Sequence, residues 1–353
     1  MHPIPHSRPL LGKREGAAVL RVLRLGHVGM GSETERLEAD AARLCGVRGA
    51  VAFSSGTTAF AAGLLALRLP PRSRVLVPSM ACAAFLQGCR LAGMRPVPFD
   101  VDPETCLPDP ADARRRSRGA RAAILFHPFG LPADPDRLPR GLEILEACGH
   151  ALGTRLGART VGSLGRFSYA SLHATKPACG AEGGFLASDD GRLLARAHDL
   201  RDCDERQDPG FRFSARLADI CAALARVQIS RLPEFRRRRR AIARRCAEAL
   251  RGTDVRLPPD RPDAPHAWYR FLAFSPRPAG EALRAFERAG IAARRPVYWP
   301  LHRILGLRGF PGAEQAWKRL VSIPIHPSLT EREIRRILSA AREAFPPARP
   351  GTL

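Results

Sequence analysis

The sequence predicts an α/β fold in which a large sheet-based domain is followed by a smaller α+β domain. Through the first two thirds of the chain, short apolar runs alternate with segments of helical periodicity, which is the pattern of a mainly parallel sheet covered by helices. A proline- and aspartate-rich break follows at residues 258–265. At 353 residues, the chain is also too long for one small core.

The predicted elements follow this alternation along the chain. Turn residues close each apolar run, and the helical segments between the runs have apolar positions three or four residues apart. The strands of the large domain are expected at residues 50–53, 74–77, 95–99, 122–126, 143–145 and 185–188, and its helices at 36–44, 58–67 and 81–93.

A helix over residues 232–250 is predicted to connect the two domains, which we place at residues 1–235 and 236–353. Beyond the break, the periodicity changes from that of a strand to that of a helix. The small domain is expected to contain a strand at 268–274 and helices at 280–290 and 330–345.

Positive charge is spread along the whole chain. The formal net charge is +23, which by itself would suggest nucleic-acid binding. The densest basic run, Arg236 to Arg240, falls in the connecting helix, where five consecutive side chains point in all directions and cannot form one face. We therefore favour anionic small molecules, such as phosphorylated or nucleotide-linked compounds, over nucleic acid as partners.

Cysteine usage indicates a reducing compartment. The nine cysteines are scattered, with no CxxC pair and no metal-ligand spacing, so we expect free thiols, no metal site and a cytoplasmic location. No apolar stretch approaches the ~18 residues of a membrane span, and the N-terminal residues lack the apolar core of a signal peptide. The sequence therefore predicts no membrane association.

Lysine is almost absent from this basic chain. Of 57 basic residues, only Lys13, Lys176 and Lys318 are lysines. Arginine serves wherever charge alone is needed, but an amine that must lose its proton and attack a carbonyl cannot be arginine. Lys176 ends the segment Ser-Leu-His-Ala-Thr-Lys, and Glu-Gly-Gly follows at 182–184. We therefore interpret Lys176 as a candidate Schiff-base lysine.

A second group of residues lies at a predicted strand-to-helix junction. Ser55, Gly56, Thr57 and Thr58 combine hydroxyls with the free backbone N–H groups of a helix start, where phosphate binds well. The same residues also suit an ordinary helix cap. Together with Lys176 they indicate a molecule that needs both a phosphate cradle and a lysine imine, and pyridoxal phosphate is such a molecule.

From about residue 26 to residue 340, the chain resembles the DegT/DnrJ/EryC1/StrS sugar aminotransferases. The most specific match is the lysine segment, 171–176, with the Glu-Gly-Gly at 182–184. The resemblance implies a fold-type-I pyridoxal phosphate enzyme, with a mixed, mostly parallel sheet flanked by helices. Further matching segments are residues 29–31, 55–59, 77–79, 96–103, 127–134, 266–268, 298–302 and 323–327.

The resemblance also implies roles for single residues. Lys176 matches the lysine that forms the internal aldimine and later carries the proton between substrate and cofactor carbons. His150 stands where the family has Gln or His against the cofactor ring and its phenolic oxygen. Two weaker matches, Tyr298 and His302, fall in the small-domain stretch that faces the substrate. The phosphate-binding positions correspond to Gly56, Thr57, Thr58 and Ser171.

One departure from the family concerns the cofactor's ring nitrogen. The family pattern Glu-Asp-Ala-Ala-Gln/His-Ala-x-Gly appears here at residues 146–153, with Ala147 in place of the aspartate. That carboxylate keeps the pyridine nitrogen protonated, and the protonated ring is the electron sink for the carbanion at the substrate carbon. Without it we expect slower proton transfer. Glu146 is adjacent, but on a strand it points to the opposite face and is a poor substitute.

Two further departures affect packing and assembly. Cys82 stands where the family usually has an aromatic residue stacked on the cofactor ring, so the stacking area is smaller. Ser214 aligns with a family asparagine that reaches the phosphate of the neighbouring subunit, and this chain contains no asparagine at all. The resemblance thus implies a homodimer in which Ser214 can still donate a hydrogen bond to the partner's phosphate.

The leading hypothesis is a pyridoxal phosphate aminotransferase that acts on the keto group of a nucleotide-linked sugar or of a related cyclic ketone. An amino donor such as glutamate would supply nitrogen, with Lys176 as the acid and base between carbons. Two alternatives follow from Ala147: altered chemistry on the same cofactor, or a catalytically degenerate partner subunit. The arginines at 294, 295 and 303 would either clamp a diphosphate or face water.

Overall fold

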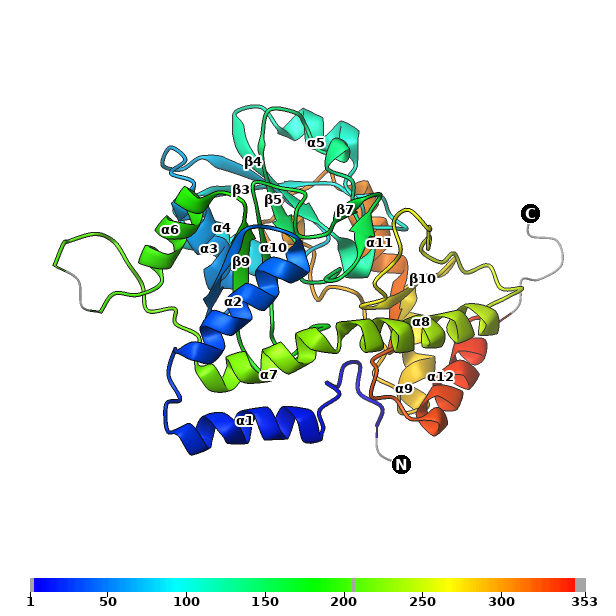
Figure 1. The fold of residues 1–353 in the computed structure, drawn as a ribbon. Coiled ribbons are helices and arrows are strands. Elements are labelled where there is room, and N and C mark those ends of the chain that lie inside the picture. Colours follow the sequence, from blue (N-terminus) through cyan, green and yellow to red (C-terminus); the bar gives the residue numbers. More distant parts are fainter. Residues whose placement is uncertain (1–2, 205–206, 347–353) are drawn as a thin grey trace.

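A seven-stranded sheet forms the centre of the large domain in the computed structural model, which describes residues 3–204 and 207–346 (Figure 1). Its strand order is β1-β9-β8-β5-β4-β2-β3, and β9 runs antiparallel to both of its neighbours while the other pairs are parallel. The mixed, mostly parallel sheet that the sequence predicts is therefore confirmed. The strands are β1 (Gly49–Phe53), β2 (Arg74–Pro78), β3 (Arg95–Phe99), β4 (Ala120–Phe126), β5 (Glu143–Ala147), β8 (Phe167–Ser171) and β9 (Gly184–Ser188), with β6 (Arg155–Leu156) and β7 (Arg159–Thr160) as a separate short hairpin.

Helices cover both faces of this sheet. On one face, Leu37 shares a buried apolar cluster with the sheet residues Ala52 and Leu125, and on the other face Phe60 shares a second cluster with Val51 and Val75. The burial of apolar side chains in these two layers is the main force that holds the large domain together. The first layer contains α2 (Ser32–Cys45), α5 (Pro110–Arg116) and α7 (Asp219–Ser230), the second contains α3 (Gly56–Ala66), α4 (Ala84–Leu91) and α6 (Gly191–Leu200), and α1 (Lys13–Leu25) packs on the outside of α7.

Helix α8 (Leu232–Ala249) runs from the large domain into the small one (Figure 1). Leu232, at the start of α8, belongs to the core between the sheet and the layer of α2, α5 and α7. Ile242 and Cys246 instead pack in the core of the small domain. That core also contains Ile4, whose backbone N–H donates to the carbonyl of Gly290 at 2.8 Å. The N-terminal segment is therefore attached to the small domain.

The small domain packs helices against a two-stranded antiparallel sheet. The predicted strand at 268–274 begins only at Phe271, because Trp268 adopts φ 53°, a left-handed value that a strand does not contain. The elements are β10 (Phe271–Phe274), α9 (Ala279–Arg288), α11 (Pro311–Arg319), β11 (Leu320–Ile323) and α12 (Glu331–Ala344), and the short helix α10 (Leu301–Ile304) places Leu301 in the core of the large domain.

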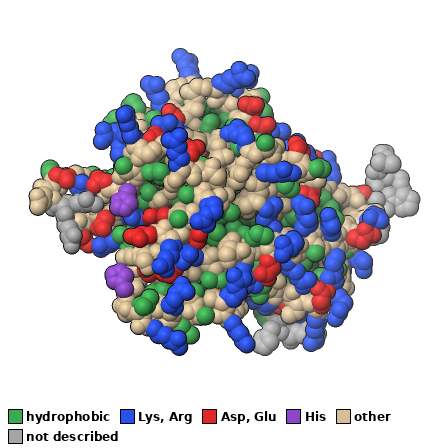
Figure 2. All heavy atoms as spheres, in the orientation of Figure 1, with side chains coloured by type: hydrophobic (Ala, Val, Ile, Leu, Met, Phe, Trp, Pro, Cys, Tyr) green, Lys and Arg blue, Asp and Glu red, His purple; other side chains and the backbone are tan. Residues whose placement is uncertain are grey.

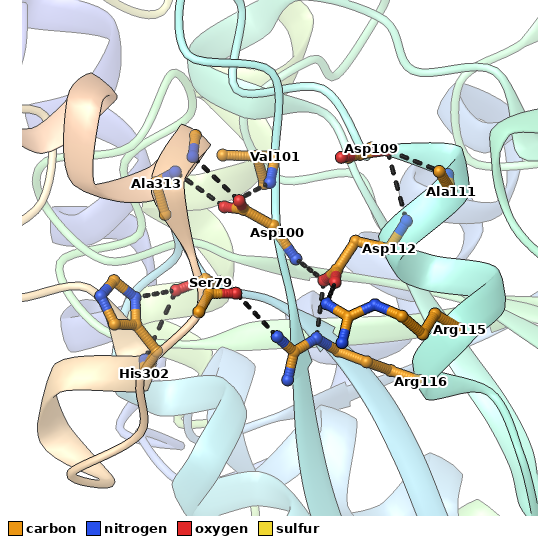
Figure 3. Close-up of polar contacts among 12 residues, drawn as sticks. Ser79, Asp100, Val101, Asp109, Ala111, Asp112, Arg115, Arg116, His302 and Ala313 are labelled. Carbon is orange, nitrogen blue, oxygen red and sulfur yellow. Dashed lines mark hydrogen bonds and ion pairs between the residues drawn. The ribbon is translucent and has the colours of Figure 1, made fainter.

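Polar contacts join the two domains beside β3 (Figure 3). The buried carboxylate of Asp100 accepts hydrogen bonds from the backbone N–H groups of Gly312 and Ala313, at 2.9 and 2.7 Å, where α11 begins. A negative charge at a helix N-terminus is favourable, because the free N–H groups and the helix dipole both stabilise it. Ser79 and His302 form a second contact, with Oγ and Nδ1 2.6 Å apart. These contacts fix the small domain against the edge of the sheet.

The arginines of α8 bind different partners around the helix, as the sequence predicts. Arg239 is buried and donates to the carbonyl of Tyr269 at 2.9 Å, whereas Arg238 pairs with Glu331 and Arg240 with Asp260. Figure 2 shows basic side chains scattered over the visible face among acidic and apolar ones. Within the described residues, no helix is both long and apolar enough to cross a bilayer.

Candidate active site

Most of the predicted cofactor residues line one cavity at the end of the sheet. The cavity has a volume of about 320 Å³ and lies between the strand ends and the start of α3. Apolar rings, among them Phe60, Phe85 and Phe126, form much of its wall. The predicted residues that line it are Gly56, Thr57, Cys82, Ala147, His150, Ser171 and Lys176.

The start of α3 lies unusually close to two strands. A Cβ on Gly184 would lie 2.5 Å from the backbone nitrogen of Gly56, and a Cβ on Gly56 would lie 2.7 Å from the Cβ of Ser171. Glycine is therefore required at both positions, which explains part of the Glu-Gly-Gly motif. Ser55 caps the helix by accepting from the N–H of Thr58 at 3.1 Å. The hydroxyl of Thr58 also bonds Ser55. Thr58, one of the predicted phosphate residues, does not line the cavity.

The amine of Lys176 is in direct contact with the ring of His150 in the cavity. Their Nζ and Nε2 atoms are 2.9 Å apart. Burial is the largest effect on the pKa of His150, and the positive charges of Lys176 and Arg270 act in the same direction. Together they lower this pKa well below its ordinary value, so the ring is neutral at pH 7. A neutral ring accepts a hydrogen bond from the amine through Nε2 and carries its own proton on Nδ1, which is buried without a partner among the described residues.

Tyr269, from the small domain, is a site residue that the sequence analysis missed. Its ring lies 4.3 Å from that of His150 between centroids, and Lys176 Nζ lies 5.4 Å from the Tyr269 centroid. Burial alone would raise the pKa of Tyr269, but Lys176 and Arg270 outweigh it and lower the pKa to about 8. A lone tyrosine within a predicted strand carries no sequence signal, because only the docking of the two domains brings it to Lys176.

Ala147 leaves the inner end of the cavity without a carboxylate. The neighbouring Glu146 is fully buried on the opposite face of the sheet, as predicted. One of its oxygens accepts from His127 Nε2 at 2.9 Å, and both accept from backbone N–H groups of residues 162–164. Every oxygen of Glu146 is thus engaged by the protein, so it cannot turn into the cavity without breaking these bonds.

The remaining predicted residues lie outside the cavity. Ser214 is exposed, and the cavity of its own chain does not contain it. The Tyr298 side chain is 89% exposed and lines a neighbouring cavity. His302 is buried and does not line either cavity, since Ser79 and Glu314 bind its two ring nitrogens at 2.6 and 2.9 Å. The structure therefore gives His302 a structural contact between the domains (Figure 3).

These groups fit pyridoxal phosphate. The start of α3 offers N–H groups and hydroxyls to a phosphate, Lys176 offers an amine to an aldehyde, and the apolar rings can enclose a flat heterocycle. His150 Nδ1 is a buried polar atom that lacks a protein partner among the described residues. A bound molecule that supplies an acceptor would satisfy it.

Comparison with known proteins agrees with this geometry. The profile of the DegT/DnrJ/EryC1/StrS aminotransferase family matches residues 9–342. The aminotransferase TlmJ from Streptoalloteichus hindustanus is 28% identical, with 97% of this chain and 98% of that chain covered and a TM-score of 0.90. DesV from S. venezuelae is also 28% identical, with 93% of each chain covered and a TM-score of 0.85. PseC from Helicobacter pylori shares the fold at 20% identity over 97% of this chain and 99% of that chain, with a TM-score of 0.89.

The fold and the lysine cavity define a pyridoxal phosphate-dependent aminotransferase. The chain belongs to the DegT/DnrJ/EryC1/StrS aminotransferase family. Its fold is therefore fold type I, and the pyridoxal phosphate predicted from the phosphate cradle and the candidate lysine is confirmed as the cofactor.

We expect Lys176 to be the only lysine that pyridoxal phosphate modifies in this chain. The holoenzyme should have a yellow absorbance band that borohydride abolishes, and peptide mapping should locate the reduced adduct on Lys176. In Lys176→Arg the adduct should be lost and transamination should fall by about a thousandfold or more, because arginine cannot form the imine. The matched control, Lys318→Arg, should keep both. An adduct on Lys13 or Lys318 would contradict the assignment.

The ionisation of the Tyr269 phenol can be followed as the pH changes, since the chain has only three tyrosines. Tyr269 should lose its proton near pH 8 in the folded protein and near pH 10 in the unfolded chain, so the folded state gains stability as the pH rises between these values. The phenolate absorbance of the apoenzyme should show a transition near pH 8. Tyr269→Phe should abolish it and Tyr298→Phe should keep it; the reverse pattern would refute the interpretation.

Proposed function

We propose that this enzyme transfers an amino group to the keto group of a nucleotide-linked sugar or a related cyclic ketone. The observation that carries the proposal is a second cavity, of about 730 Å³, that continues from the lysine cavity. Thr175 lines both, so a ligand can place its keto group near Lys176 and extend the rest of its body into the second cavity. A free amino acid would leave that space unused.

The second cavity is electropositive. Arg270, Arg294 and Arg295 line it, and within the described residues no carboxylate forms an ion pair with Arg270 or Arg294. Burial, and after it the charges of Arg270 and Arg294, lower the pKa of the adjacent His6 to about 2, which shows how strongly the surroundings disfavour another positive charge. Two guanidinium groups without acidic partners suit the diphosphate of a nucleotide sugar.

Aromatic rings lie at the outer side of the same cavity. Trp299 and Trp317 stack with centroids 5.1 Å apart and an angle of 9° between the rings. Tyr298 is 89% exposed beside them. Exposed flat rings next to an anion site favour a ligand that carries a flat base. This arrangement supports the weaker prediction of Tyr298 as a substrate residue.

The residues around Lys176 have separable roles in the reaction. Pyridoxal phosphate, when bound, supplies the group that takes nitrogen from the donor and passes it to the keto substrate. The Lys176 amine holds and returns the proton that moves between the two carbons. Neutral His150 orients that amine through Nε2, and the start of α3 would hold the phosphate of the bound cofactor. Tyr269 packs against the His150 ring, and apolar rings form part of the cavity wall.

The test is a two-part reaction of the purified holoenzyme. Adding glutamate should move the absorbance band to shorter wavelength, and a nucleotide keto sugar should then restore it faster than the free keto sugar does. DesI, a protein of the same fold, was solved with its TDP-sugar product, so TDP-linked ketones are tested first. No band shift with any amino donor would favour the alternatives based on Ala147, namely altered chemistry or a degenerate partner subunit.

The arginines of the second cavity can be tested separately. Arg294→Gln should raise the KM for a nucleotide keto sugar about ten- to hundredfold, because a charged hydrogen bond to phosphate is worth about 1.5–3 kcal/mol. The reaction with glutamate should change little. Arg251→Gln, which removes an exposed arginine paired with Glu248, is the control. An equal effect of Arg294→Gln on nucleotide-linked and free keto sugars would exclude a diphosphate contact.

We also propose that the enzyme is a homodimer whose subunits complete each other's sites. Next to exposed Ser214, the large apolar side chain of Phe211 is 67% exposed, which is unusual for a phenylalanine and favours a covered surface. Light scattering should give twice the chain mass, including at high salt. A stable monomer would refute this part of the proposal.

A further inference from the structure

The absence of a carboxylate at residue 147 draws attention to what else lines the inner end of the lysine cavity. Tyr169 lies on β8 directly opposite Ala147 on β5, because the two residues are register partners in the parallel pair. Opposite residues on neighbouring strands point to the same face of a sheet. Both side chains accordingly line the cavity that contains Lys176.

The hydroxyl of Tyr169 has no partner in the protein. The side chain is only 6% exposed, and its Oη atom is buried without a hydrogen bond to any described residue. A buried hydroxyl normally has a partner, since the loss of its hydrogen bonds with water is otherwise uncompensated. An orphaned hydroxyl in a ligand cavity therefore indicates a bound group that supplies the missing partner.

The ring of Tyr169 is held in one position. It stacks on Phe60 with centroids 4.6 Å apart and an angle of 19°, and Phe85 packs edge-on against it at 6.2 Å. Phe167 flanks it at 6.4 Å. These contacts prevent the ring from swinging the hydroxyl out to water, so the hydroxyl stays buried beside the cavity that Ala147 also lines.

The hydroxyl is also confined to the neutral, proton-donating form. Burial is the main cause, and the neighbouring thiols of Cys82 and Cys89 add to it: together they raise the pKa of Tyr169 well above its ordinary value. A phenol that keeps its proton can donate a hydrogen bond to a nitrogen lone pair, but it cannot hold a proton on that nitrogen as a carboxylate does.

We propose that Tyr169 takes the place of the missing carboxylate and donates a hydrogen bond to the unprotonated pyridine nitrogen of pyridoxal phosphate. This deepens the assignment of the cofactor and rests on it. Ala147 supplies the room, since its methyl group leaves space between the strand and the ring that an aspartate would occupy. The bound ring nitrogen then carries a hydrogen bond but no charge, and the ring withdraws electrons less strongly.

The decisive experiment measures the nitrogen itself. Apoenzyme is reconstituted with pyridoxal phosphate labelled with nitrogen-15 in the ring, and the nitrogen chemical shift is recorded. The wild type should show an unprotonated, hydrogen-bonded nitrogen. Tyr169→Phe should move the signal to the position of a pyridine without a donor. The double variant Ala147→Asp with Tyr169→Phe should give a protonated nitrogen, because the carboxylate then returns.

Stability measurements separate this role from a structural one. Tyr169→Phe keeps the ring and removes only the unpartnered hydroxyl, so the apoenzyme should be as stable as the wild type or more stable. The affinity for pyridoxal phosphate should fall by about tenfold, because the hydrogen bond exists only in the holoenzyme. A residue with a structural role alone would instead destabilise the apoenzyme and leave the cofactor affinity unchanged.

Tyr269→Phe is the matched control, since it removes a hydroxyl from the Lys176 side of the cavity, and it should leave the nitrogen signal where it is in the wild type. An unchanged nitrogen signal in Tyr169→Phe, or a protonated nitrogen in the wild type, would overturn the proposal while the cofactor assignment stands. A wild-type protein that does not bind pyridoxal phosphate would overturn both.

Discussion

The close contact between the start of α3 and the ends of β8 and β9 is the constraint on which the site depends. It is possible only because Gly56 and Gly184 lack side chains. The contact brings the free N–H groups of a helix start next to the strand that leads to Lys176. The predicted phosphate cradle and the candidate Schiff-base lysine thereby line one cavity, which is the arrangement that pyridoxal phosphate requires.

Electrostatics then determine how the groups in that cavity behave. His150 is held neutral by burial and by the nearby positive charges, whereas the same charges favour the phenolate of Tyr269. At the other end, Tyr169 keeps its proton because mainly thiols and apolar rings surround it. The cavity therefore has a charged end at Lys176 and an uncharged end at Ala147. An unprotonated cofactor nitrogen suits the uncharged end, where a positive charge would have no carboxylate partner.

Much of the site was predictable because it depends on local chemistry. Lys176 stood out because lysine is rare in this chain, and the Ser-Gly-Thr segment stood out because helix starts that bind anions have few sequence solutions. The opposite orientation of Glu146 followed from the alternation of a strand. In contrast, Tyr169 and Tyr269 gave no signal, since their importance depends on strand register and on domain docking. The surroundings of His302 were hidden for the same reason: its position near Tyr298 in the sequence did not reveal that Ser79 and Glu314 bind its ring, and its substrate role stays a prediction.

The sequence by itself determined the alternation of strands and helices, and it predicted the candidate Schiff-base lysine and the phosphate cradle. These follow from residue type and short-range periodicity, whereas the missing aspartate at residue 147 follows from the resemblance to the family. Only the tertiary structure decided which side chains meet around Lys176, that Tyr169 and Ala147 are register partners, and that an arginine-lined cavity shares Thr175 with the lysine cavity. The physical reason is that these contacts join segments distant in the sequence or neighbouring strands in a particular register, and packing rather than local preference sets both.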